Sequence, residues 1–130
     1  MTIIDTSVLL DVLVAGATHG DESQTRMEAA LRAGRLAVND IIAAELAPTF
    51  AAEDDLWATL SEAQITLAPY PRAAVYLAGQ AFRRYRRRGS ARQRILPDFM
   101  IGAHAVAAGA ALLTRDRGFY RDYFPGVRLA

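Results

Sequence analysis

The chain has 130 residues, of which 52% are hydrophobic and 22% are charged, and this predicts one folded domain that spans residues 1–130. Fifteen basic and fourteen acidic residues leave a formal net charge of +1, so overall charge indicates neither nucleic acid nor membrane as a partner. Every basic residue is an arginine, and cysteine is absent. Without lysine or cysteine the chain cannot form a P-loop, a Schiff base, a disulfide or a thiolate zinc site.

The N-terminal segment does not resemble a secretory signal, because Asp5 and Asp11 interrupt it and no basic residue precedes its apolar residues. The later apolar stretch at 99–113 contains His104 and is shorter than the roughly 18 residues that a membrane span needs. We therefore expect a cytoplasmic protein that does not associate with membranes.

The first part of the chain alternates short apolar runs with segments of helical spacing. Residues 2–4 predict a strand, and apolar residues follow with helical spacing at 7–14. After a turn-rich connection, we predict a helix at 21–31, a second strand at 36–38 and a helix at 41–50.

The second part continues this alternation, with a helix at 54–63, a strand at 65–67 and a long helix at 71–88. A polar loop at 89–95 precedes a helix of small residues at 98–108. Two further strands are predicted, at 111–114 and 127–129. Because helices usually form the crossovers between parallel strands, this order predicts an α/β sandwich around a mostly parallel sheet.

Several residues predict where helices begin and end. Asp40 is expected to cap the helix at 41–50, and Pro48 to bend or end it. Pro71 suits the first position of the long helix. Gly34 and Gly89 are expected to end the helices that precede them.

Four acidic residues stand out by their position. Asp5 and Asp116 follow predicted strands, and ligands of open parallel sheets bind beyond the carboxyl ends of the strands. Asp98 begins a helix after Pro97, and Glu45 lies in the apolar segment IIAAEL, where an unpaired buried carboxylate is costly. If the four share one crevice, they repel one another unless a cation is bound. Oxygen ligands without cysteine indicate Mg²⁺ or Mn²⁺, which support phosphodiester hydrolysis.

Each of these acids alone also has a structural interpretation. Asp5 and Asp98 would simply cap helices, Asp116 would belong to a turn before Gly118, and Glu45 would reach solvent beside the bend at Pro48. We favour the structural interpretation for four further residues. Asp11, Asp40 and Asp122 each fit a helix face, a cap or an exposed turn, and His104 fits a packed position on a helix. Hydroxyl groups of Thr6, Ser7 and Thr114 flank the four acids and would bond a carboxylate or a metal-bound water, or else cap locally.

Four segments together resemble the PIN-domain family, and in particular its VapC-type toxins: IDTSVLLD, NDIIAAEL, PDFMIGAHA and LLTRDRGF. They occur in the expected order and span nearly the whole chain. The resemblance implies a three-layer α/β/α sandwich with a central mostly parallel sheet, and RNA cleavage with Mg²⁺ or Mn²⁺. It further implies a homodimer and a VapB-like antitoxin whose tail covers the active cleft.

Carried over motif by motif, the resemblance makes Asp5, Glu45, Asp98 and Asp116 the catalytic and metal-binding acids. Thr6 and Thr114 match the hydroxyl positions that support such a site. Gly118 stands where many relatives carry another acidic residue, so this position does not supply a fifth metal ligand.

The segment FRRYRRRGSARQR is the strongest local concentration of charge. Arginine binds phosphate well and interleaved aromatic residues stack on exposed bases, so we assign RNA phosphate binding to Arg86, Arg87 and Arg88. Neutralising these three should weaken RNA binding and flatten its salt dependence. The alternatives are stabilisation of a helix C-terminus, with Phe82 and Tyr85 buried, or contact with an acidic antitoxin.

The leading functional hypothesis is a metal-dependent endoribonuclease, the toxin of a VapBC-type toxin–antitoxin pair. A nuclease specific for DNA or for a nucleic-acid structure is one alternative, because the acids do not distinguish ribose from deoxyribose. A catalytically silent PIN-like binding module is another. Phosphatases with an aspartate after a strand resemble this arrangement but rely on a lysine, which the chain lacks.

Overall fold

A computed structural model describes residues 1–89 and 94–130. One sheet contains five strands, in the order β3-β2-β1-β4-β5, and every pairing is parallel. The strands are β1 (Thr2–Ile4), β2 (Leu36–Val38), β3 (Ile65–Leu67), β4 (Ala111–Leu113) and β5 (Arg128–Leu129). The helices in the described ranges are α1 (Thr6–Leu13), α2 (Gly20–Ala33), α3 (Asp40–Leu46), α4 (Glu53–Glu62), α5 (Arg72–Arg88), α6 (Leu96–Ala107) and α7 (Arg117–Tyr123).

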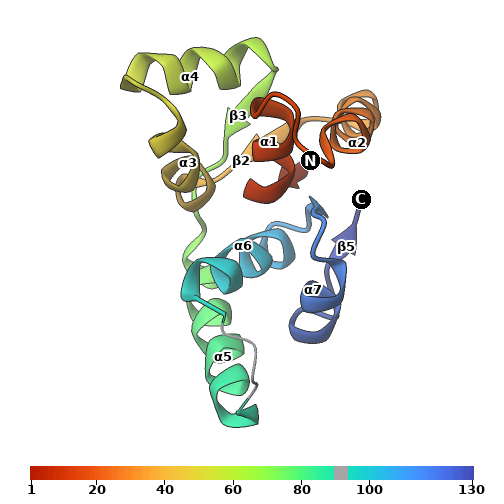
Figure 1. Cartoon of the computed structure of the whole chain (residues 1–130). Helices are drawn as coiled ribbons and strands as arrows, with labels where there is room; N and C mark the ends of the chain where they lie inside the picture. The colour runs from red at the N-terminus through yellow and green to blue at the C-terminus, as the bar shows by residue number, and fades with distance from the viewer. Residues whose placement is uncertain (90–93) are drawn as a thin grey trace.

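The helices cover both faces of the sheet (Figure 1). Successive strands step outward from β1 to β2 and β3, and the chain then returns to β4 on the other side of β1. Because crossovers between parallel strands are right-handed, reversing the direction of travel moves the helices to the opposite face. Accordingly α1 to α4 lie on one side and α5 to α7 on the other (Figure 1). The predicted three-layer α/β/α sandwich with a parallel sheet is confirmed.

The central strands are buried on both faces, which explains their uninterrupted apolar sequences. Every residue of β1 and β2 is buried. In register, Ile3 of β1 lies between Ala37 of β2 and Leu112 of β4, and all three are fully buried. The sheet thus provides a rigid platform whose carboxyl edge carries the segments that follow β1 and β4.

Aromatic rings join the three helices of the second layer. Phe99 of α6 is fully buried and contacts Phe82 of α5 and Phe119 of α7, both with ring centroids 5.2 Å apart. Tyr123 of α7 packs on Phe99 at 5.6 Å. At Gly102 of α6 a side chain would collide with the end of α7, because an added Cβ would lie 2.5 Å from the ring of Phe124, which follows α7, and 3.0 Å from the ring of Tyr120. These contacts fix α7 against α6.

Three predictions about helices need correction. Asn39 caps α3, since its side chain accepts a hydrogen bond from the Ile42 backbone N–H at 2.9 Å, and Asp40 is the first helical residue. Pro71 is the N-cap of α5 rather than its first residue. Helix α7 was not predicted, so Asp122 lies in a helix and not in a turn.

The remaining helix predictions agree with the structure to within a few residues. Helix α3 ends at Leu46 and continues as a 3-10 helix at Ala47–Thr49, which contains Pro48. Of the predicted loop at 89–95, residues 90–93 and therefore Arg92 lie outside the described residues. No helix in the ranges that the structure describes is both long and apolar enough to cross a membrane.

Candidate active site

The candidate site lies where the strand order reverses. Strands β1 and β4 are neighbours, yet the chain leaves them for opposite sides of the sheet, and such a point opens a crevice beyond the carboxyl ends of the strands. Asp5 directly follows β1, and its backbone N–H donates to the Leu113 carbonyl of β4 at 2.9 Å. Asp116 follows β4 by three residues. Topology therefore brings together two acids that are 111 positions apart in the sequence.

Thr114 connects these two acids. Its fully buried hydroxyl group donates to Asp5 Oδ2 at 2.7 Å and accepts the backbone N–H of Asp116 at 3.0 Å. The Ser7 hydroxyl group lies 3.4 Å from the same Asp5 oxygen. The hydroxyl group predicted to support the site thus has a defined geometry, because it joins both strand-end segments.

Asp5 does not cap α1 with its side chain. It occupies the N-cap position of α1 but makes no capping hydrogen bond with its side chain, and it is only 8% exposed. Burial raises the pKa of its carboxyl group above the ordinary value of 3.8, and the charges of Asp98 and Glu45 raise it further. The hydrogen bonds from Thr114 and from the Thr6 backbone act in the opposite direction. Asp5 therefore shares its electrostatic environment with two of the other predicted acids.

Glu45 approaches from α3 and is held by Thr6. The Thr6 hydroxyl group donates to Glu45 Oε1 at 2.6 Å, which links the first turn of α1 to the last turn of α3. Glu45 is half-buried and accepts a defined donor, so it does not merely extend into solvent. The predicted pair of Thr6 and Glu45 is thus a direct contact.

Asp98 lies in the first turn of α6, after Pro97, and is half-buried. Burial raises the pKa of its carboxyl group above 3.8, and the negative charge of Asp116 adds to this. The charge of Arg94 and a hydrogen bond with the Ile95 backbone lower it. Asp98 thus combines two roles that sequence analysis treated as alternatives, since it bonds the helix start and also faces another acid.

Tyr120 of α7 lies within electrostatic range of all four predicted acids. It is 2% exposed, and burial raises the pKa of its phenol group strongly. The negative charges of Asp5, Asp98, Asp116 and Glu45 all raise this pKa further. All four predicted site acids are therefore close enough to act on one buried side chain.

Arg94 places a positive charge among these acids. Its guanidinium group forms an ion pair with Asp116 and lies 4.3 Å from the centre of the Phe119 ring. The side chain is only 13% exposed, and the charges of Asp116 and Asp98 help to raise its pKa. Sequence analysis counted Arg94 in the arginine segment but did not assign it to the acidic site. Its position four residues before Asp98 was the available signal.

The arginine segment divides between two places. Arg88 and Arg94 line a cavity together with Asp116, whereas Arg86 and Arg87 line a separate hollow on α5 beside Phe82. The structure therefore does not group the three arginines that were predicted to bind phosphate.

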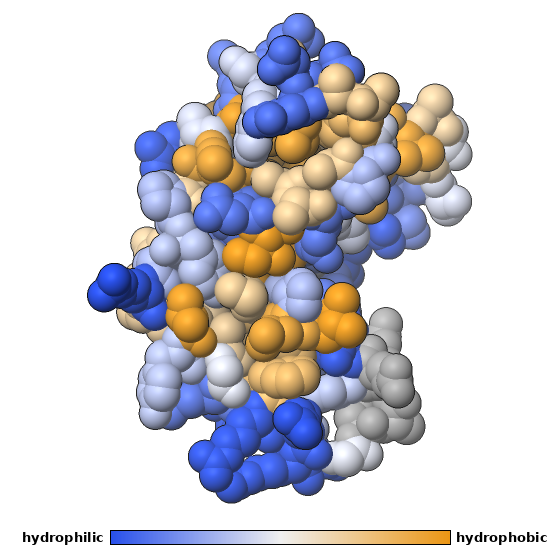
Figure 2. All heavy atoms as spheres, turned by 90° about the vertical axis from the view of Figure 1, so that its left-hand side faces the viewer, coloured by the Kyte–Doolittle hydropathy of each residue, from blue (hydrophilic) through white to orange (hydrophobic). Residues whose placement is uncertain are grey.

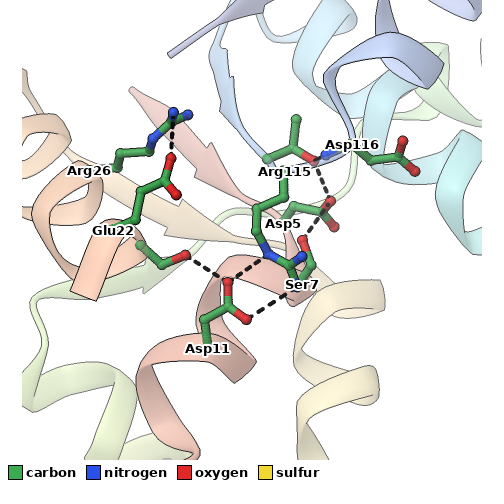
Figure 3. A network of polar contacts seen from close by, with 9 residues as sticks. Asp5, Ser7, Asp11, Glu22, Arg26, Arg115 and Asp116 are labelled. Carbon is green, nitrogen blue, oxygen red and sulfur yellow. Dashed lines mark hydrogen bonds and ion pairs between the residues drawn. The ribbon is translucent and has the colours of Figure 1, made fainter. Parts of the chain in front are cut away.

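Asp11 is an acid outside the predicted four, and it helps to hold the segment that carries Asp116. Its carboxylate accepts two hydrogen bonds from Arg115, at 2.7 and 3.2 Å, and one from Ser23 at 2.7 Å. Arg115 directly precedes Asp116, so this network ties α1 and α2 to the segment that carries a site acid (Figure 3). The structural interpretation of Asp11 is confirmed, although its partner was not predicted. His104 is likewise a packed residue, fully buried, with its Nδ1 3.1 Å from Asn39 Nδ2.

The donor atoms suit a hard divalent cation. Carboxylate and hydroxyl oxygens are the ligands that Mg²⁺ and Mn²⁺ prefer, and buried acids with raised pKa values would be stabilised by a cation. Among the described residues, however, no three acidic or histidine side chains are close enough together to hold an ion. The chemistry of the site fits a metal, while the acids would have to draw together to bind it.

Known proteins share this architecture. VapBC2 from Rickettsia felis, solved bound to a DNA fragment from its promoter, aligns with a TM-score of 0.73 and 18% identity over 99% of this chain and 96% of that one. VapBC-1 from nontypeable Haemophilus influenzae gives 0.72 and 15% over the same shares. VapC20 from Mycobacterium tuberculosis, a toxin that cleaves the sarcin-ricin loop, gives 0.62 and 17% over 98% of this chain and 99% of that one.

These identities are low, so the likeness establishes the fold. Comparison with curated protein sequences finds no match. The family description "PIN domain", in contrast, matches residues 2–124, which include all four site acids. Enzymes of this family generally use divalent metal ions. The chain belongs to the PIN-domain family.

Proposed function

We propose that this protein is a metal-dependent endoribonuclease and the toxin of a VapBC-type toxin–antitoxin pair. The observation that carries the proposal is that Asp5 and Asp116, which the Thr114 hydroxyl group joins, lie at the crevice between β1 and β4. Glu45 is bonded to Thr6, next to Asp5, and the charge of Asp116 acts on Asp98. Membership of the PIN-domain family and the likeness to a toxin that cleaves the sarcin-ricin loop support the proposal.

In the proposed mechanism the four acids would hold Mg²⁺, or alternatively Mn²⁺. The ion, when bound, supplies a Lewis acid and lowers the pKa of a coordinated water. Thr114 orients Asp5, and Thr6 orients Glu45, through the hydrogen bonds described above. Arg94 lies against Asp116, where its charge would meet an incoming phosphate group.

A cleavage assay with matched variants tests this proposal. Antitoxin-free wild type, Asp98→Asn and Asp55→Asn would be incubated with labelled total RNA and with single-stranded DNA, in Mg²⁺, Mn²⁺ or chelator. Asp55 is an exposed acid in the first turn of α4, so its variant makes the same chemical change away from the site. We expect metal-dependent RNA cleavage that Asp98→Asn abolishes and Asp55→Asn retains.

Other outcomes would replace the proposal with one of its alternatives. Equal cleavage of DNA would indicate a nuclease that does not select RNA. Intact RNA after incubation with folded, metal-binding wild type would indicate a catalytically silent binding module.

The proposed partners are a second copy of the chain and a VapB-like antitoxin. Structures of VapBC complexes among the similar proteins support the antitoxin as a partner. In addition, α5 exposes Val75 and Tyr76, which are 55% and 71% exposed, and apolar side chains gather on this face of the molecule (Figure 2). Exposed apolar patches of this kind commonly mark protein interfaces. Light scattering should give the mass of a dimer, and a double Val75→Ser, Tyr76→Ser variant should dissociate it; a monomeric wild type would contradict this.

A further inference from the structure

A cavity of about 520 Å³ opens beside the acidic site, on the side of α7. Its lining includes Asp116, so it is continuous with the site, and the cationic side chains of Arg88 and Arg94 also border it. The volume falls within the range of roughly 300 to 1,000 Å³ that is usual for small-molecule pockets. A space of this size accommodates one nucleotide rather than a nucleic-acid helix.

Part of the cavity wall is aromatic and is held in place, and Asp122 joins Asp116 as a second acid in the lining. Tyr85, Phe119 and Tyr123 line it, and the rings of all three pack against buried Phe99, with centroids 5.2 to 5.6 Å away. The backbone N–H of Arg94 donates to the Tyr85 hydroxyl group at 2.6 Å, which ties the rim of the cavity to α5. Rings that are fixed in advance offer flat surfaces to a planar ligand without further loss of conformational entropy.

The two arginines of the cavity lie over these rings. The Arg94 guanidinium carbon is 4.3 Å from the centre of Phe119, and that of Arg88 is 5.4 Å from the centre of Tyr123. Planar cations and aromatic faces together are the surfaces that stack unpaired bases in single-stranded RNA. Arg94 also reaches Asp116, so a nucleotide whose base lies against these walls would present its phosphate group to the acids.

We propose that this cavity binds the base of one unpaired nucleotide next to the phosphodiester bond that is cleaved. The inference rests on the proposed function in taking RNA as the source of that base, and it adds a subsite that positions the substrate. It also separates the arginines: Arg88 and Arg94 serve the subsite, whereas Arg86 and Arg87 lie outside it.

Binding of mononucleotides tests the subsite without requiring cleavage. The four ribonucleoside 5′-monophosphates and ribose 5-phosphate would be titrated into ¹⁵N-labelled full-length protein in the presence of chelator. We expect the nucleotides to shift the amide resonances of Gly118, Phe119 and Tyr123, and to bind roughly tenfold more tightly than ribose 5-phosphate, which lacks a base to stack. Because no catalysis is involved, this result is independent of whether the protein is a nuclease.

Two arginine variants provide a matched comparison. Arg88→Gln removes a charge from the cavity, and Arg87→Gln makes the identical change one residue earlier, on the separate hollow. Both residues are exposed in the last turn of α5, so both variants should fold. We expect Arg88→Gln to weaken nucleotide binding several-fold and Arg87→Gln to leave it unchanged.

Three results would overturn the inference. Equal affinity for ribose 5-phosphate would show that the cavity holds only phosphate. Equal effects of the two arginine variants would indicate a general attraction of charge. Failure of all four nucleotides to shift these resonances at millimolar concentration, while purified antitoxin shifts them, would assign the cavity to the protein partner.

Discussion

Replacing Thr114 with valine tests whether its hydroxyl group organises the acidic site. Valine has nearly the same shape, so the change removes the donor to Asp5 and the acceptor of the Asp116 backbone N–H without opening a large cavity. Hydrogen bonds to charged groups contribute about 1.5–3 kcal/mol, and here both the hydroxyl group and the carboxylate are buried. We therefore expect the free energy of unfolding to fall by about 1.5–3 kcal/mol in urea denaturation at neutral pH.

The same variant should also change the pH dependence of RNA cleavage. The bond from Thr114 lowers the pKa of Asp5, against the effect of burial, so its loss should raise that pKa further. Since the site is proposed to act with its carboxylates ionised, the acidic limb of the rate profile should move to higher pH.

Thr66→Val serves as the control for both measurements. The Thr66 hydroxyl group donates to the Leu36 carbonyl at 3.2 Å, on β3 and away from the acids. It should lower stability slightly and leave the pH profile in place. A Thr114→Val variant with wild-type stability and an unmoved acidic limb would refute the role of this hydroxyl group.

Three further variants test the packing and electrostatics of the fold. Gly102→Ala should lower stability by about 1–3 kcal/mol in urea, because its Cβ would lie 2.5 Å from the buried ring of Phe124; unchanged stability would mean that α6 and α7 separate easily. Asp11→Asn should lower the free energy of unfolding by about 1–2 kcal/mol and reduce the rate of cleavage, because it breaks the ion pair with Arg115. The 40% exposure of Arg115 limits the loss of stability. Thermal unfolding measures the first effect and initial cleavage rates measure the second. For Asp98 the raised pKa means that the folded carboxyl group contributes stability that is fully present below the unfolded pKa of 3.8 and lost as pH rises through the folded pKa. Metal-free Asp98→Asn should therefore melt above wild type at pH 7, with the difference vanishing toward pH 3.5, and a variant that melts lower at pH 7 would contradict this.

The local pattern of the sequence determined most of the elements. The strands at 2–4, 36–38 and 65–67 have the predicted bounds, because short buried runs between helices permit little else. Helix α7 was missed, since RGFYRDY is short and mixes charged and aromatic residues without a clear apolar face. It is a helix because Phe119 and Tyr120 are buried there, and this depends on the other helices of that layer.

For the candidate site, the sequence predicted which acids to consider, because acids that follow strands or begin helices occupy predictable positions at a sheet edge. Only the tertiary structure decided their partners. The bonds from Thr114 to Asp5 and from Arg115 to Asp11 join residues more than 100 positions apart, which sequence spacing cannot relate. The tertiary structure also decided which arginines lie near the acids. Successive side chains of a helix point about 100° apart, and at the end of α5 Arg87 and Arg88 border different hollows. Only the packed position of α7 determines which of the two lies beside the acids.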